Sequence, residues 1–112
     1  MSTPEERLEE LGLAVPDVAK PVAAYVPAVR SGQYVFTSGQ LPMRDGQLIT
    51  AGKVGGEVTA EEAVECARQC ALNALAAVRA EVEEGLRRLA DYLAAWAAFD
   101  AWCAVRGDPT PV

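Results

Sequence analysis

The sequence predicts an α+β fold in which a small antiparallel sheet packs on a long helix and a divergent helical segment follows. Strand-forming residues on both sides of Ser31 and Gly32 indicate a β-hairpin. A capping-box sequence at Thr59 then opens a long run with helical spacing of apolar residues. We expect a single domain over residues 1–112, made of an N-terminal helix and linker (1–21), a hairpin and helix (22–82) and a helical tail (83–112).

The first expected element is a short helix at the N-terminus. Thr3 is a suitable N-cap, Pro4 suits the first helical position, and Glu6 completes a capping box. Gly12 is a natural stop for this helix. Residues 13–21 contain two prolines and little periodicity, which indicates a linker on the surface.

Two strands and a second turn are expected next. Residues 22–30 carry apolar side chains on both faces of a predicted strand, so we expect both faces to be covered. Pro27 lacks a backbone donor, which favours a sheet edge or a bulge. Residues 33–38 are rich in aromatic and β-branched side chains and form the returning strand. A tight turn at Asp45-Gly46 predicts a short third strand over 47–50.

The long helix is expected to begin at Thr59, because Glu62 completes a capping box with it. Its predicted apolar face consists of small and medium residues, which allow close packing on a sheet: Ala63, Ala67, Cys70, Ala71, Ala74, Leu75 and Val78. Its predicted polar face carries Glu61, Glu65, Arg68 and Gln69. Paired carboxylates can serve acid–base chemistry, but a solvated helix face is the ordinary role of such residues.

The tail, residues 81–106, also has the composition of a helix. Its two apolar stripes are Leu86, Leu89, Leu93 and Trp96, and Tyr92, Trp96, Phe99 and Cys103. We expect Gly85 to separate this helix from the preceding one, and Gly107 and Pro109 to end it. Between Tyr92 and Val105 the tail is apolar almost all round, so this segment must be buried by its own chain or by a partner. Core or interface packing is a simpler use of its aromatic residues than a cofactor slot.

Composition excludes several classes of function. The chain has no histidine, which removes Ser-His-Asp and Cys-His catalysis and every metal site that contains histidine. A net charge of −6 argues against nucleic-acid binding, and with it against a ribonuclease role. Three cysteines and an acidic N-terminus without an apolar segment predict a cytoplasmic protein with free thiols. Asp91 and Asp100 exclude a membrane span in the tail.

The glycine-rich connection only partly fits a phosphate-binding loop. Gly46 lies one residue too far from Gly52 and Lys53. Val54 stands where a magnesium-binding serine or threonine is required. A turn before a helix is therefore the simpler interpretation.

The cysteines are expected to serve packing. Cys66 and Cys70 lie four residues apart on the predicted helix and would share a face. Two thiolates without further ligands make a poor zinc site, and cysteine is a common small buried residue. We expect the same role for Cys103 and predict no metal site.

Tyr25 and Ser38 are the remaining candidates for chemistry. Antiparallel pairing of their strands would bring a phenol and a hydroxyl into one neighbourhood, where they can orient a polar ligand. Without a neighbouring base Ser38 is not an activated nucleophile. The residues alone leave two interpretations open, a polar pocket and ordinary strand residues.

The stretches "AAYVPAVRSGQYVFTSGQLPM" and "GKVGGEVTAEEAVECARQCALNALAAVRAEV" resemble the Rid family, the reactive intermediate deaminases, also called the YjgF family. The resemblance covers residues 20–82, with weaker similarity from Leu11. It implies a partial chorismate-mutase-like fold and a homotrimer with clefts between subunits. It further implies hydrolysis of enamines or 2-imino acids to 2-keto acids and ammonia, without a cofactor.

The resemblance also implies which residues hold the substrate. Tyr25 matches the aromatic residue that lines the family's cleft, and Ser38 matches the serine near the substrate. Gly39 lets the backbone come close to the substrate there. The family's second half supplies an arginine that clamps the substrate carboxylate and a late glutamate that assists water. Neither motif is found after Val82, and Arg87, Arg88 and Arg106 stand in another context.

Three hypotheses therefore remain, and the last of them is a remnant of the family without activity. The first is an enamine or imine deaminase whose site includes Tyr25, Ser38 and Gly39, with catalytic residues unidentified. The second is a non-catalytic module that binds small molecules or a partner protein on a truncated Rid scaffold, with the apolar tail as an interface.

Overall fold

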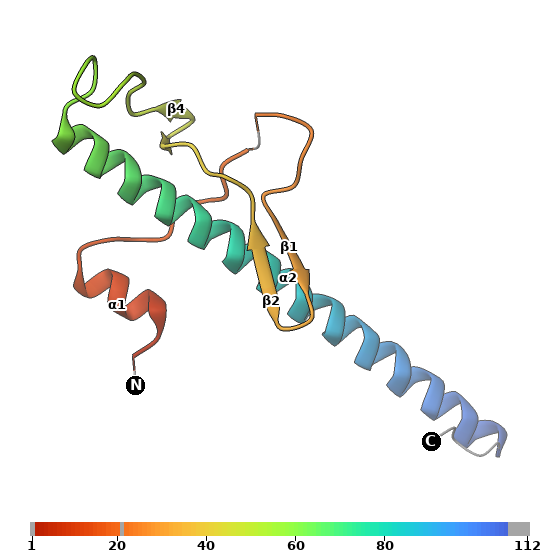
Figure 1. Ribbon diagram of the computed structural model, residues 1–112. Coiled ribbons are helices and arrows are strands. Elements are labelled where there is room, and N and C mark those ends of the chain that lie inside the picture. Colours follow the sequence, from red (N-terminus) through yellow and green to blue (C-terminus); the bar gives the residue numbers. More distant parts are fainter. Residues whose placement is uncertain (1, 21, 108–112) are drawn as a thin grey trace. The chain divides into compact units, whose positions relative to one another are not determined.

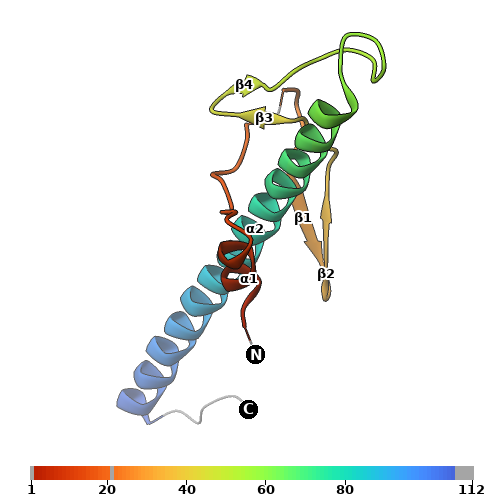
Figure 2. The same ribbon diagram turned by 90° about the vertical axis from the view of Figure 1, so that its left-hand side faces the viewer.

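The computed structural model describes residues 2–20 and 22–107, so that Pro21 and Pro109 lie outside the described residues. Two compact units are present, the first ending at Glu81 and the second beginning at Val82. The element order is α1 (Pro4–Glu10), β1 (Ala28–Ser31), β2 (Tyr34–Thr37), β3 (Met43–Arg44), β4 (Gln47–Leu48) and α2 (Ala60–Arg106) (Figure 1; β3 is labelled in Figure 2). No helix among the described residues is long and apolar enough to cross a membrane.

Helix α1 has the predicted capping box. The amide of Glu6 donates to the Thr3 hydroxyl at 3.2 Å, and the amide of Thr3 donates to the Glu6 carboxylate at 2.7 Å. Pro4 occupies the first helical position, where its missing N–H leaves no bond unmade. The helix ends at Glu10, and Gly12 follows with a φ of +70°. The start and stop signals in the sequence therefore set both ends of α1.

Strands β1 and β2 form the first hairpin, with Ser31 opposite Tyr34. Gly32 has a φ of +60° at the first central position of the two-residue turn, as a type II′ turn requires. Strand β1 is shorter than the predicted strand over residues 22–30. The amide of Ser38 donates to the Pro27 carbonyl at 3.0 Å, but Pro27 has no N–H to return the bond. The ladder therefore ends beside Pro27.

Only one face of this hairpin is covered. Ala28 is buried on one face, whereas Val29 and its cross-strand partner Phe36 are exposed on the other. Tyr34 lies on the exposed face as well, and its ring centroid is 6.3 Å from that of Phe36. The expectation that both faces are covered was wrong, because successive side chains point to opposite faces and the sheet has protein on one side alone.

Strands β3 and β4 form a second hairpin around the predicted turn (Figure 2). Asp45 and Gly46 have φ values of 52° and 79°, the pair of left-handed residues that defines a type I′ turn. The third strand predicted over 47–50 is present only at Gln47–Leu48. It pairs with β3 rather than with the first hairpin, so the described chain has two separate two-stranded sheets.

Helix α2 begins with the predicted capping box, in which Thr59 and Glu62 exchange bonds of 2.8 and 3.2 Å. It continues without interruption through Gly85, so the prediction of a break there was wrong. A glycine inside a helix costs only about 1 kcal/mol relative to alanine, and strong helix formers stand on both sides. Gly107, with a φ of +73°, follows the last helical residue.

The buried face of α2 is rotated from the predicted one. Asn73, Ala76 and Ala77 are the most buried residues of its first part, whereas three predicted face residues, Ala67, Ala71 and Leu75, are exposed. Gln69 was predicted on the polar face and is buried, with 6% of its surface exposed. Gln69 was assigned to solvent by residue type, but its amide is hydrogen-bonded to Asn73 and can be buried at little cost.

Candidate functional site

Ser38 lies directly after β2, where the first hairpin ends. Its hydroxyl donates to the Pro27 carbonyl at 3.3 Å, and its own carbonyl accepts a bond of 3.3 Å from the Gln40 side chain. The hydroxyl proton is thus directed at the backbone, while the oxygen keeps its acceptor sites. No base accompanies Ser38 in these bonds, so the geometry offers an orienting hydroxyl rather than an activated nucleophile.

Tyr25 and Gly39 line one small cavity at this end of the hairpin, together with Lys20, Pro27 and Gln40. Its volume of about 20 Å³ holds no more than a water molecule. Ser38 adjoins the cavity through its bond to Pro27. The structure therefore brings the three residues singled out in the sequence into one region, with Tyr25 and Gly39 in the wall and Ser38 beside it.

The surroundings of this cavity are open. Tyr25 is 42% exposed, and a Cβ placed on Gly39 would meet no other atom of the described chain within 4 Å. A ligand can therefore approach the tyrosine ring and the glycine backbone from outside. Lys20 supplies a positive charge in the same wall, which sequence analysis did not single out because an isolated surface lysine carries no motif.

A larger cleft of about 540 Å³ lies next to this cavity and shares Ala19, Lys20 and Met43 with it. Two buried amides, Gln69 and Asn73, line the cleft. A volume of this size falls within the usual range for small-molecule sites. Lys20 is therefore placed to contact a ligand in either space.

The amides of this cleft form a continuous network between α2 and the second hairpin. Asn73 donates to the carbonyls of Leu41 and Met43 at 3.0 and 3.1 Å, and accepts a bond of 3.0 Å from Gln69. Gln69 in turn accepts a bond of 3.2 Å from Arg44. Sequence analysis missed this network, although an amide pair spaced i and i+4 on a helix was a signal for it.

Arg44 connects the network to solvent. Its Nη1 lies 2.8 Å from the Glu65 carboxylate, and both side chains are about half exposed. Because Arg44 already bonds to Glu65 and Gln69, its guanidinium is not available as a free carboxylate clamp. This leaves Lys20 as the cation of the candidate site.

The cysteines and the glycine loop show packing and turn geometry. Burial, and then the neighbouring Cys66 thiol, raise the pKa of Cys70, which keeps its thiol protonated. No group of three potential metal ligands occurs among the residues that the structure describes.

In the glycine-rich loop, the amides of Gly55, Gly56 and Val58 donate to carbonyls of the same loop. They are therefore not directed toward an anion.

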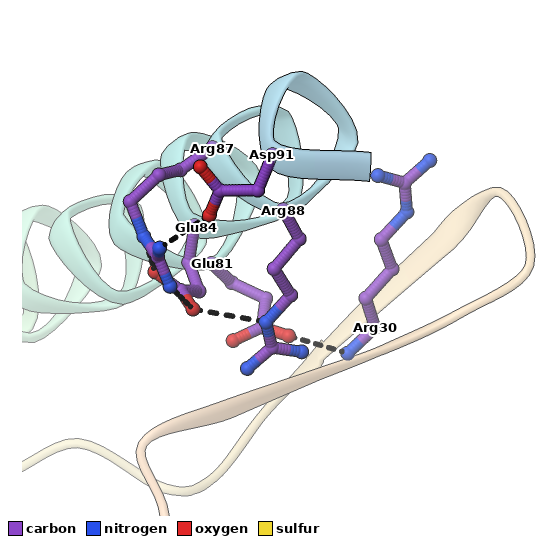
Figure 3. Close-up of polar contacts among 6 residues, drawn as sticks. All are labelled: Arg30, Glu81, Glu84, Arg87, Arg88 and Asp91. Atoms are coloured by element: carbon purple, nitrogen blue, oxygen red, sulfur yellow. Dashed lines mark hydrogen bonds and ion pairs between the residues drawn. The ribbon is translucent and has the colours of Figure 1, made fainter. Parts of the chain in front are cut away.

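The tail arginines are engaged with carboxylates of the same helix (Figure 3). Arg87 lies 2.7 Å from Glu84 and 2.8 Å from Asp91, and Arg88 lies 2.9 Å from Glu84. These hydrogen bonds lower the pKa of Glu84 to about 2. In the other unit, Glu81 accepts a bond of 3.2 Å from the backbone amide of Arg30.

Comparison with known proteins matches residues 5–95 to a family described as "YjgF/chorismate mutase-like, putative endoribonuclease". This span is wider at both ends than residues 20–82, the range of the resemblance noted from the sequence. Protein TCP17 of Trypanosoma cruzi is 37% identical over 73 residues, which are 65% of this chain and 46% of that protein.

Two solved structures are similar to the chain. One, from Shewanella oneidensis and described as "a putative endoribonuclease", has a TM-score of 0.65 and 37% identity, over 70% of this chain and 52% of its own. The other, protein Atu1372 of Agrobacterium tumefaciens, is described as of unknown function. It has a TM-score of 0.62 and 42% identity, over 70% of this chain and 47% of its own. The chain thus spans about half the length of these relatives, and it belongs to the YjgF/chorismate-mutase-like (Rid) family.

Proposed function

We propose that the protein binds small 2-imino acids at the end of the first hairpin and hydrolyses them to 2-keto acids. Water would add to the carbon of the C=N bond, and ammonia would leave as the carbonyl forms. The observation that carries this proposal is the common cavity wall of Tyr25, Gly39 and Lys20, with Ser38 adjoining it.

Each residue has a role that its chemistry supports. The Lys20 ammonium would pair with the substrate carboxylate, a task for which a point charge suffices when a planar arginine fork is absent. The Tyr25 and Ser38 hydroxyls would orient the nitrogen and the attacking water. Gly39 would leave room for the substrate against the backbone. The rate increase would come from orientation and hydrogen bonding, because the site contains no strong base.

The assembly in this proposal is a homotrimer in the cytoplasm, with the site completed by a neighbouring copy. The small volume of the cavity in a single chain supports this, since about 20 Å³ cannot enclose an imino acid. No cofactor takes part in the proposed step, because hydrolysis of an imine requires water alone.

Hydrolysis of a freshly generated imine tests this function. An amino-acid oxidase would produce the 2-imino acid, and its decay would be followed with and without the purified chain. We expect faster decay that is lost in Tyr25→Ala, Ser38→Ala and Lys20→Ala. Ser31→Ala is a matched control, because Ser31 lies at the opposite end of the same hairpin. Equal decay with and without folded protein would reject the deaminase function for that substrate.

A second candidate, ligand binding without turnover, is favoured by the engagement of Arg87 and Arg88 with Glu84 and Asp91. Neither of these two arginines is then free to clamp a substrate carboxylate. Titration calorimetry with a 2-keto acid separates the two candidates. Binding that Lys20→Ala abolishes, in a protein that does not accelerate imine decay, would establish the binding module.

A further inference from the structure

The tail helix, residues 82–106 of α2, exposes large apolar side chains along one seam. Leu86, Leu89, Leu93 and Trp96 recur at intervals of three and four residues, the a and d positions of successive heptads. Tyr92 and Phe99 occupy the neighbouring g positions. The exposed fractions of the six side chains lie between 42% for Phe99 and 65% for Tyr92. A helix with such a stripe is covered when it is stable in water.

The charges of this helix lie on its other faces. Glu84, Arg87, Arg88 and Asp91 occupy b, c and f positions of the same heptads, and each is bound to another of the four at 2.7 to 2.9 Å (Figure 3). Their charges are therefore paired within one helix and do not reach the seam. The first charged residue at a seam position after Leu86 is Asp100, which limits the apolar contact to residues 86–99.

The seam is large enough for a specific contact. If each of its six side chains loses about 100 Å² of exposed surface, the two sides together bury about 1,200 Å², the lower bound for a stable protein interface. Ala90 and Ala97 occupy the e positions beside the leucines. Their small side chains allow a second helix to approach closely.

We propose that the tail helix is a self-association surface, and that its occupant is the tail helix of a second copy of this chain. A two-fold pair sets the same patch against itself, so the patch must be self-complementary. The seam meets this condition, because its leucines and aromatic rings need no opposite charge on the other side. A different partner protein would be selected mainly by charged groups in the patch. The seam has no charged group between Leu86 and Phe99, and its only polar groups there are the Tyr92 hydroxyl and the Trp96 indole N–H.

This surface is independent of the proposed catalytic function, since it uses no residue of the first hairpin. If the hairpin units also form trimers, pairing of tails joins two trimers into a hexamer. Without trimers it gives a dimer. In both cases disruption of the seam halves the mass of the particle.

Light scattering coupled to gel filtration of the full chain tests the proposal. Leu93→Glu places a charge at the centre of the seam, and Ala98→Glu places the same charge at an exposed f position of the same helix. We expect Leu93→Glu to have half the mass of the unchanged protein, and Ala98→Glu to keep the full mass. If the unchanged protein and both variants have the same mass, the proposal is overturned, and this includes the case in which all three are monomers. The seam would then be covered by its own chain or by another partner.

The unchanged protein provides a second test that does not depend on the folding of a variant. Trp96 lies in the seam and Trp102 at a c position outside it. Dilution through the dissociation range should shift tryptophan emission to longer wavelength as Trp96 enters water. The shift should persist in Trp102→Phe and vanish in Trp96→Phe. A shift that instead follows Trp102, or emission that does not change while the mass halves, would contradict the seam.

Discussion

The side-chain amide of Asn73 lies 3.1 Å from the carbonyl oxygen of Met43, which ties the first third of α2 to the start of a strand 30 residues earlier. A second bond of 3.0 Å to the Leu41 carbonyl uses the other amide hydrogen. Asn73 is 2% exposed, so its amide depends on these protein partners rather than on water for its hydrogen bonds. One amide therefore attaches the second hairpin to α2.

Loss of this amide should destabilise the first unit. Asn73→Ala leaves two carbonyls and the Gln69 amide without a partner, and we expect the free energy of unfolding to fall by about 2–4 kcal/mol. Urea denaturation measures it. Arg68→Ala, at an exposed position of the same helix, should change stability by less than about 0.5 kcal/mol. If both variants lose the same free energy of unfolding, the amide network contributes nothing to stability.

Two glycines form a matched pair for separating backbone strain from ligand access. A Cβ would meet no atom within 4 Å at either Gly39 or Gly46, but only Gly46 has a left-handed φ, of +79°. Gly46→Ala should therefore lower stability by about 1–2 kcal/mol, whereas Gly39→Ala should leave it unchanged.

Thermal unfolding of both variants checks the prediction about these glycines. A lower melting temperature for Gly39→Ala would mean that its backbone is more constrained than its dihedral angles indicate. If the proposed site is correct, Gly39→Ala should still weaken binding of a 2-keto acid.

The ion pairs of the tail predict a specific pH dependence. Hydrogen bonds from Arg87 and Arg88 lower the pKa of Glu84 from 4.5 to about 2. Because the folded pKa is the lower one, the helix stabilisation by this carboxylate is complete above about pH 4.5 and is lost as the pH falls through about 2. Carboxyl carbon shifts measured by NMR should give a Glu84 midpoint near 2. A midpoint near 4.5 would show that the exposed pairs do not persist in solution.

Substitutions at Gly85 test the continuity of α2. Alanine should raise the helical signal at 222 nm and stabilise the helix by about 1 kcal/mol, whereas proline should lower the signal and cost about 3 kcal/mol. Circular dichroism of the two variants checks both the expected increase for alanine and the expected decrease for proline. Tolerance of proline would instead favour two helices that are separated at this residue.

Local signals in the sequence predicted the elements whose causes are local. The capping boxes at Thr3 and Thr59 and the turn at Asp45-Gly46 depend on residues a few positions apart, and all three occur as expected. The prediction of a helix break at Gly85 was wrong, because the low helix propensity of glycine was outweighed by the strong helix formers on both sides.

The candidate site was only partly predictable, because it depends on contacts between distant residues. Tyr25, Ser38 and Gly39 were identified through a resemblance of motifs. Lys20 and the pair of Gln69 and Asn73 were missed, since their environment arises when residues 16–20 and the second hairpin meet α2. Residue type placed Gln69 on the solvent side, and only its bonds to Arg44 and Asn73 explain its burial.

The bond between Glu81 and the Arg30 amide has a consequence for how the first sheet can be extended. Arg30 and Val35 face each other as a pair without mutual bonds, so the Arg30 amide points away from β2, toward the free side of β1. Glu81 occupies the place that a further strand would take. The outward amides and carbonyls of Val35 and Thr37 on β2 make no hydrogen bond to another described residue. An added strand could therefore pair with β2 without breaking an existing hydrogen bond, whereas at β1 it would have to displace Glu81. The sheet is thus more easily extended at β2 than at β1.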